Sequence, residues 1–474
     1  MKKPSFALAS ILGIILFVAP LLNASWDVWS KTLIHLLTVV LALVFLIFYL
    51  PQKPFNKIPS VASTFFLWLL LTSVFSQITF NTELELHNWI NYIILFVIIL
   101  ALPEKYVKHS LKFIIAVTSV IVFFGLYQYF IQNQSMPDST MVNPNILAGY
   151  LVLVIPLLFS IHNGNTNIRK LVTLILLVSS VLCLVLTKSL SGFIGLLSAA
   201  LIIKYRWRGF FISITIFLFL LSFKLKDPDV VNRFLWWEAC IRIIKDNPLF
   251  GTGLGTFQFI YPKYKTSALS SLFAHNFYLQ LCSEIGIPGL LILITLIFIS
   301  FKQISNKYIK ISLLAILIQN IFEYNLFILA NGTLFWFILA YGTKLNHIVK
   351  NDSTTVPEHS SISDNKLILV KCLLIMSLII YCNGFIRIYL STRAYNLAEN
   401  VLISKDFKLS ENYLIKAKTI KPNIWMAYSK LSGIYLDKFE NTHCKSYLYE
   451  ALSYSEKTSS YNRYYKYYHA KKSN

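Results

Sequence analysis

The residues best suited to chemistry gather in one stretch, 224–286, where polar, aromatic and glycine residues interrupt long apolar runs. Arg233 lies four residues before Trp237, so both side chains would share one face of a helix expected at 231–246. A guanidinium there can bind a phosphate through two hydrogen bonds while its alkyl stem rests on apolar surface. An arginine that reaches lipid phosphate at the membrane interface, or that pairs with a nearby carboxylate, would fit the same position.

His275 is the second candidate, because an imidazole titrates near neutral pH and can remove a proton from a hydroxyl group. It would open the last helix of the stretch, with Tyr278 and Leu279 on the same face. Asn276 would pair with Gln280, four residues further on. A histidine that only caps or packs this helix is the competing interpretation. The sequence has no nucleophile elbow, so a Ser–His–Asp mechanism is not indicated.

Three glycines, Gly251, Gly253 and Gly255, precede the histidine in a GxGxG arrangement. A dinucleotide-binding loop requires GxGxxG between a strand and a helix, so the third glycine falls one residue early. The spacing instead favours a backbone that closely approaches a ligand or a helix end, or a plain tight turn. No group of His, Cys or carboxylate residues has metal-ligand spacing, and none of the six cysteines forms a CxxC pair. We therefore expect neither a metal nor a cofactor.

The composition indicates which elements must position these residues. Of 474 residues, 56% are hydrophobic and only 14% are charged, against about 25% charged in a typical soluble domain. This excludes a soluble enzyme and indicates a polytopic membrane protein, surrounded by membrane lipids. The formal net charge of +22 would also suit a nucleic-acid-binding protein. Cytoplasmic loops rich in Lys and Arg explain it better, so no nucleic-acid partner is expected.

Apolar runs of membrane-spanning length recur along the chain. We predict an all-α fold of about 12–13 transmembrane helices, with candidate spans at 7–22, 32–50, 60–79, 88–102, 110–131, 146–162, 169–187, 190–204, 208–223, 287–301, 308–326, 331–348 and 366–390. Lys and Arg concentrate in alternate loops, which places the N-terminus inside. The loop 224–286 and the tail from 391 would then both lie outside.

The tail has an internal repeat, which divides the chain into a membrane domain at 1–390 and a helical tail at 391–474. Leu397, Leu414 and Ala417 recur 34 residues later as Leu431, Leu448 and Ala451, the period of a tetratricopeptide repeat. Helices are expected at 391–403, 407–419, 423–437 and 442–456. Since two repeats are few for an independent domain, the tail would lean on the membrane domain or on a protein partner. A pair of ordinary helical hairpins is the alternative.

The motifs of the outer loop occur in a recognisable order. Arg-x-x-x-Trp is followed by Asn-Pro-x-x-Gly-x-Gly-x-Gly-x-Phe, His-Asn-x-Tyr-Leu-Gln and Glu-x-Gly-x-x-Gly over about 232–290. An earlier Asn143-Pro144-Asn145 begins another apolar helix. This series resembles the O-antigen ligase and polymerase superfamily. The resemblance implies a GT-C-like glycosyltransferase in the bacterial cytoplasmic membrane, with its site and C-terminus facing the periplasm or outside.

The resemblance also implies a reaction and a set of residues. Such enzymes move a glycan from an undecaprenyl-diphosphate carrier to an acceptor hydroxyl, without metal or cofactor. Arg233 would bind the diphosphate and His275 would act as general base. Further substrate-binding candidates are Trp236, Lys188, Asn145, Gly253, Tyr261, Asn276, Gln280 and Glu284. A second arginine of the family is replaced by Leu190, and the nearby Lys188 would substitute for it as a point charge.

The acceptor stays open at this point: ligases use lipid A–core, polymerases a lipid-linked glycan, and protein O-glycosyltransferases a Ser, Thr or Tyr hydroxyl. A transporter or flippase of lipid-linked glycans is the alternative function. It would require charged residues inside the spans. The charges lie near span ends, at positions such as Lys112, Glu323, Lys371 and Arg387. A non-catalytic scaffold would not explain the density of polar and aromatic residues in the outer loop.

Overall fold

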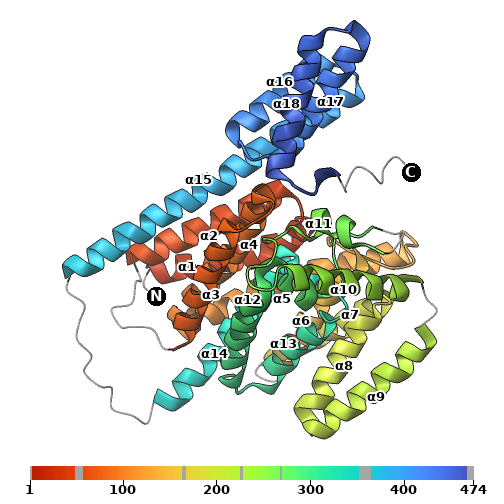
Figure 1. Cartoon of the computed structure of the whole chain (residues 1–474). Helices are drawn as coiled ribbons and strands as arrows, with labels where there is room; N and C mark the ends of the chain where they lie inside the picture. Colours follow the sequence, from red (N-terminus) through yellow and green to blue (C-terminus); the bar gives the residue numbers. More distant parts are fainter. Residues whose placement is uncertain are drawn as a thin grey trace.

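The structure is a computed structural model that describes residues 3–48, 57–162, 167–224, 228–266, 270–351 and 364–466. Over these ranges the chain forms α-helices and two short 3-10 helices, with no β-strand (Figure 1). The prediction of an all-α polytopic membrane protein is confirmed. Residues 225–227 and 267–269 of the predicted outer loop, and 467–474 of the predicted tail, lie outside the described residues.

Every predicted span overlaps a helix. These helices are α1 (Lys3–Leu21), α2 (Val28–Phe48), α3 (Lys57–Val74), α4 (Thr79–Ala101), α5 (Glu104–Phe130), α6 (Pro144–His162), α7 (Asn167–Leu186), α8 (Leu190–Tyr205), α9 (Trp207–Lys224), α12 (Phe277–Lys302), α13 (Lys307–Gln319), α14 (Leu329–Asn351) and α15 (Asp364–Ile403). Among the described helices, six are long and apolar enough to cross a membrane: α2, α4, α5, α6, α12 and α15.

The outer surface of the helix bundle is apolar. Large side chains remain exposed along α7, α9 and α15, among them Val172, Ile175, Phe211, Phe219 and Ile380. A helix with an apolar outward face is stable in lipid, because its backbone groups are hydrogen-bonded within the helix. The surface therefore agrees with a multi-pass membrane protein.

The helix α6 lies at the centre of the bundle, where every residue from Ile146 to Leu158 is buried. It packs against α7, α8, α13 and α14. Its start is well defined: Pro144 occupies the first helical position, where its missing N–H costs nothing, and Asn143 Oδ1 accepts a hydrogen bond from Ile146 N at 3.0 Å. This cap fixes the Asn143-Pro144-Asn145 motif at the end of the bundle.

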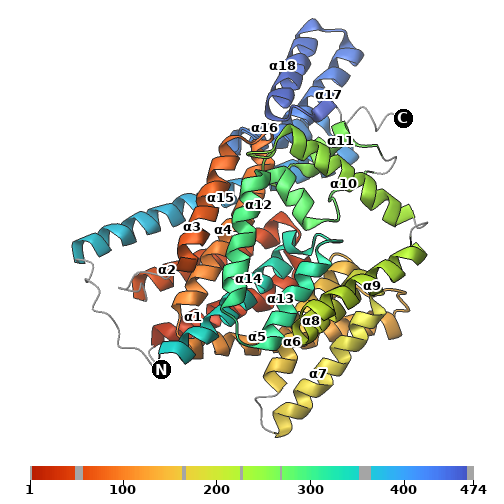
Figure 2. The same cartoon turned by 60° about the horizontal axis from the view of Figure 1, so that its bottom comes forward.

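The helix α12 bends at Gly286, whose φ of 75° favours glycine. The bend receives the loop that follows α10 (Pro228–Asp246), because Ile287 N donates to Pro248 O at 2.9 Å. A Cβ at Gly286 would lie 1.8 Å from Leu249 O. The helix predicted at 231–246 is α10, which begins three residues earlier, at Pro228. The helix α11 (Phe257–Tyr264) follows it. Both helices lie at the end of the bundle that carries the tail (Figure 2).

The tail contains α16 (Phe407–Ile420), α17 (Trp425–Thr442) and α18 (Lys445–Tyr461). The helix expected at 391–403 is not separate, because α15 runs without a break through residue 390. The last span and the first tail helix are therefore one helix. α15 packs against α16, and α17 against α18, as two hairpins. The tetratricopeptide identity of these hairpins and the division into two domains stay predictions.

The tail rests on the first turns of α4. Lys421 forms an ion pair with Glu83, and Trp425 Nε1 donates to Asn81 Oδ1 at 3.1 Å. Asn423 Nδ2 also donates to Glu83 Oε1, at 2.9 Å. These contacts hold the hairpins against the same end of the bundle as α10 and α11 (Figure 1).

Candidate active site

One buried carboxylate joins the two residues predicted to be catalytic. Glu323 is 1% exposed, and its Oε1 lies 3.1 Å from Nη2 of Arg233. Its other oxygen, Oε2, lies 3.4 Å from Nδ1 of His275. Arg233 Nη1 also donates to Phe322 O at 2.9 Å. The guanidinium and the imidazole thus meet on opposite oxygens of one side chain.

Three separate segments supply these groups. Arg233 projects from α10, His275 precedes α12, and Glu323 lies in the turn between α13 and the 3-10 helix η2 (Asn325–Phe327). Backbone bonds tie two of the segments together, because Phe277 N donates to Asn320 O at 3.0 Å and to Glu323 O at 3.1 Å. Hence the first turn of α12 and the turn that carries the carboxylate are held as one unit.

His275 adopts the left-handed backbone conformation, with φ of 51°, which is uncommon for a residue with a side chain. It precedes the N-cap Asn276, whose Oδ1 accepts from Leu279 N at 2.9 Å. The predicted pairing of Asn276 with Gln280 is wrong. Gln280 Oε1 instead accepts from Ala274 N at 3.0 Å, and its Nε2 donates to Glu284 at 3.2 Å. The reason is that Asn276 is the N-cap, so its side chain accepts from the backbone of the first turn and is not available to Gln280.

Aromatic rings fix the plane of the imidazole. The His275 ring stacks on Trp236 with centroids 5.2 Å apart and 28° between planes. Tyr324 approaches the same ring edge-on at 4.9 Å. Nδ1 is the ring nitrogen that lies near Glu323 Oε2, at 3.4 Å. The contact is not a hydrogen bond, since both atoms lack a hydrogen-bond partner among the described residues.

Arg233 borders a cavity of 670 Å³ at the end of the bundle. Two other predicted residues, Lys188 and Asn145, line the same cavity. Its polar lining, called the rim below, also includes Glu323 and Asp229. Its apolar lining, called the walls, includes Leu190, Ile194, Phe217, Leu220, Leu221 and Phe234. A rim with cations beside apolar walls suits a ligand with an anionic head and a hydrocarbon chain.

The positive charge of Arg233 is partly neutralised by Glu323. Glu323 already engages one edge of the Arg233 guanidinium, whose side chain is 23% exposed. A guanidinium has five N–H donors, so this edge and the Phe322 carbonyl leave further donors for an anion. The alternative of an ion pair is thus found for Arg233, with Glu323 as the partner, whereas the nearby Glu238 pairs with Arg242.

The glycine loop serves packing. Gly253 has φ of 104°, and a Cβ there would lie 2.4 Å from Ser76 Oγ and 2.5 Å from Thr82 Oγ1. Its amide donates to Glu284 O at 2.9 Å. The loop is therefore pressed between α4 and α12, as the closely approaching backbone that was one of our interpretations. Gly253 lines neither the large cavity nor the cavity described next.

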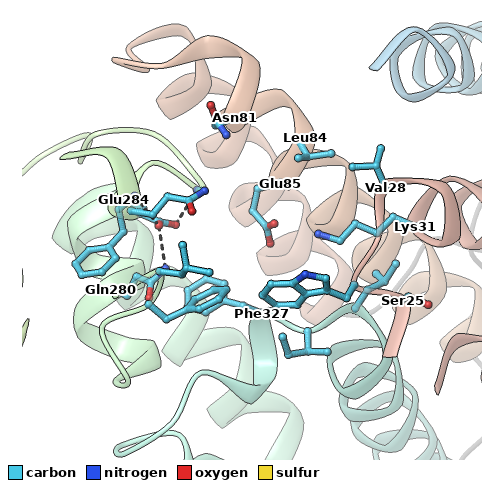
Figure 3. A pocket seen from close by; sticks show the side chains of 17 residues that line it. Ser25, Val28, Lys31, Asn81, Leu84, Glu85, Gln280, Glu284 and Phe327 are labelled. Carbon is cyan, nitrogen blue, oxygen red and sulfur yellow. Dashed lines mark hydrogen bonds between the residues drawn. The ribbon is translucent and has the colours of Figure 1, made fainter. Parts of the chain in front are cut away.

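Glu284 and Gln280 belong to a second, smaller cavity of 210 Å³. Figure 3 shows them entering from α12 while Asn81 and Glu85 enter from α4 and Lys31 from α2. Glu284 is fully buried and accepts hydrogen bonds from Gly255 N at 2.9 Å and Phe257 N at 3.3 Å. The predicted substrate-binding residues thus divide between two cavities.

Tyr261 lies in neither cavity. It is fully buried in the apolar cluster that includes Trp236, and its ring stacks on Phe257 at 5.3 Å. Burial raises the pKa of its phenol to about 12, so the side chain is neutral at physiological pH and serves to anchor α11.

Glu323 is the residue that motif reasoning missed. The available signal was an acidic side chain at the end of an apolar run, where an unpaired charge is costly. Within the described ranges, no group of three or more His, Cys, Asp or Glu side chains could hold a metal ion.

Comparison with known families gives one match. Residues 148–294 match the family model described as O-antigen ligase. The matched segment includes Lys188, Arg233 and His275 but ends before Glu323. No curated protein matches the chain, and no solved structure does.

Proposed function

With an O-antigen ligase domain at residues 148–294 of an all-helical membrane protein, we propose that the chain transfers a glycan from an undecaprenyl-diphosphate carrier to an acceptor hydroxyl, on the outer face of the bacterial cytoplasmic membrane. The observation that carries this proposal is the Arg233–Glu323–His275 connection at the rim of a cavity with apolar walls. The domain itself supports a membrane glycosyltransferase-like role.

The donor would occupy the 670 Å³ cavity. Its diphosphate would lie at the rim beside Arg233 and Lys188, and the first isoprene units would lie against Phe217 and Leu220. The bond between the anomeric carbon and the diphosphate oxygen breaks during transfer, so negative charge grows on the leaving group. Preorganised cations stabilise that charge where it develops.

His275 would act on the acceptor. As the acceptor oxygen attacks the anomeric carbon, its proton passes to Nε2, and the ring becomes cationic. Glu323, 3.4 Å from Nδ1, stabilises this imidazolium and keeps the ring oriented. Once the diphosphate has left, the proton returns to solvent. A single displacement of this kind inverts the configuration at the anomeric carbon.

A deletion strain tests the proposal. Mass spectrometry should find the undecaprenyl-diphosphate glycan accumulating, and its glycan missing from the acceptor, in cells that lack the gene. Wild-type chain should reverse both changes, whereas Arg233→Ala should reverse neither at equal membrane abundance. An unchanged glycan profile in the deletion strain would remove the proposed function. Accumulation of the donor on the inner face alone would favour the alternative, a flippase.

A further inference from the structure

Two further cavities lie next to each other and apart from the 670 Å³ cavity proposed for the donor, which is called the donor cavity here. The inner one is the 210 Å³ cavity between α2, α4 and α12. The outer one, of 580 Å³, lies between the start of α2 and the part of α15 that leads into the tail. They share the lining residues Trp26 and Val28, so they lie side by side, and together they are called the depression below. In the described part of the chain, neither shares a lining residue with the donor cavity.

The outer cavity combines aromatic rings with amides. Trp29 is 49% exposed and lies with Tyr389 beside Asn396 and Asn400 of α15. Flat rings stack on the apolar faces of sugars, while amide groups both donate to and accept from hydroxyl groups. An apolar ligand would not use the amides, and the two charged lining residues, Arg393 and Asp27, have opposite signs.

The inner cavity contains a buried acceptor atom with unused capacity. Glu85 Oε1 is buried and lacks a hydrogen-bond partner among the described residues. Figure 3 shows Glu85 between Lys31 and the Glu284–Gln280 pair. A buried carboxylate oxygen without a donor is costly, and a hydroxyl group would satisfy it. At 210 Å³ the cavity is smaller than ligand pockets of roughly 300–1,000 Å³, so it fits one sugar ring rather than several.

A line of rings connects this depression to the base. Trp26 lies 5.8 Å from Phe273, and Phe273 stacks on Tyr324 at 4.0 Å with parallel planes. Tyr324 in turn contacts His275. Two rings, Phe273 and Tyr324, therefore separate the inner cavity from the imidazole, and both must turn aside for a hydroxyl to reach His275.

We propose that the adjoining cavities form the acceptor site and that the acceptor is an oligosaccharide. Its terminal sugar occupies the inner cavity, where Glu85 accepts from a hydroxyl, and the preceding sugars lie along Trp29, Tyr389 and Asn396. The tail helix α15 thus contributes to acceptor recognition. This inference rests on the proposed function, because it assigns the second substrate of the same transfer.

Photocrosslinking in cells tests the occupant directly. We would place p-benzoylphenylalanine at Leu397, which lines the outer cavity, in the full-length chain. Ile380, on the lipid-facing side of the same helix, is the matched position. Irradiation should yield an adduct at position 397 that stains for carbohydrate and is removed by chemical deglycosylation, and none at position 380. A protease-sensitive adduct without carbohydrate, or no adduct at position 397, would overturn the proposal.

Transfer kinetics separate this inference from the proposed function. The probe is the acceptor-glycan fraction extracted from a deletion strain, added to full-length protein in nanodiscs with the lipid-linked donor. Trp29→Ala should raise the KM for that fraction about tenfold and leave the donor KM unchanged. The control Trp207→Ala, on the exposed α9 surface, should change neither. A normal acceptor KM in Trp29→Ala, with Arg233→Ala and His275→Ala inactive, would refute the site alone; transfer by those two variants would refute the function.

Discussion

The Nδ1 atom of His275 lies 3.4 Å from a carboxylate oxygen of Glu323, although the two residues come from different turns of the chain. Under the proposed function, this contact would stabilise the protonated imidazole and leave Nε2 for the acceptor. The helix that follows is capped by Asn276 rather than by His275.

We expect Glu323→Gln to reduce turnover by about 10²-fold or more, since the amide keeps the shape but cannot stabilise an imidazolium. The donor KM should be unchanged or lower, because Arg233 loses a competing anion. Both quantities can be measured in nanodiscs with lipid-linked donor. Glu238→Gln, on the exposed pair with Arg242, is the control and should behave as wild type. Normal turnover of a folded Glu323→Gln protein would show that the carboxylate is only structural.

Substitutions of His275 test the base itself. His275→Ala should lower turnover by about 10² to 10⁴-fold, the usual contribution of a general base, while donor binding stays near wild type. His275→Gln keeps size and hydrogen bonding but cannot take a proton, so its turnover should fall similarly. If well-folded His275→Gln turned over at the normal rate, the histidine would have no part in the chemistry.

Arg233 and Lys188 should differ in their sensitivity to substitution. Arg233→Lys keeps the charge but loses the planar fork, so we expect a large loss of activity. Lys188→Arg should retain activity, because the side chain acts as a point charge at the cavity rim, and Lys188→Ala should lose part of it. Initial rates with lipid-linked donor measure all three. Arg242→Lys, a surface change on the same helix as Arg233, serves as the reference; a loss there would point to α10 packing instead.

Reporter fusions test sidedness. Fusions at about 265 and 440 should both read extracytoplasmic, because the alternating Lys and Arg bias places these segments outside. A fusion at about 205, between α8 and α9, should read cytoplasmic. The structure places α10, α11 and the tail at one end of the bundle (Figure 2), so the first two fusions must agree with each other. Opposite readings at 265 and 440 would contradict the fold as well as the topology.

The tail should weaken at acid pH through Glu411. Burial raises the pKa of this carboxyl, but hydrogen bonds from Lys438 and Tyr435 and the Lys438 charge outweigh burial and hold its pKa below the ordinary 4.5. Because the pKa is lower in the folded state, the pair stabilises the tail above pH 4.5, and this contribution is lost as the pH falls through the folded value. Glu411→Gln should destabilise α16 and α17 by about 0.5 kcal/mol at pH 7 and by less at pH 4.

Hydrogen exchange of tail peptides in the full-length protein, corrected for the intrinsic rate at each pH, measures this difference. The exposed pair of Glu399 with Lys430 offers the matched control, and Glu399→Gln should have a smaller effect at pH 7. An equal loss of protection at both pH values would separate the Glu411 effect from its ionisation.

Much of the fold could be predicted because membrane helices need about 20 apolar residues each, and that signal is local. Local spacing also drew attention to Arg233 and His275, whose roles stay predictions. It mispaired Asn276 with Gln280 because Asn276 caps the helix that begins at Phe277. Glu323 could not be assigned a partner from sequence. Its contacts with α10 and with the residue before α12 arise from tertiary packing across some 90 and 48 positions, which no periodicity encodes.

The two cavities illustrate the same limit. Lys188 and Asn145 share the large cavity with Arg233, whereas Gln280 and Glu284 face the small one. Residues of a single motif series thus contribute to different surfaces, because Arg233 lies on α10 whereas Gln280 and Glu284 lie on the first turns of α12. A sequence motif gives the order of the residues but not the cavity that each side chain lines.

Because α15 is unbroken, the number of residues in it determines the position and orientation of the tail hairpins. An α-helix turns about 100° and rises about 1.5 Å with each residue, and α15 carries both the contact of Tyr381 with His87 O and the bonds from Arg387 to Ile420 O. Inserting or deleting one residue between these two contacts would swing the hairpins around the helix axis and separate Trp425 from Asn81. The segment 381–387 should consequently resist insertions and deletions during evolution, even though it lies close to the junction of two parts of the chain, where a linker would otherwise be natural.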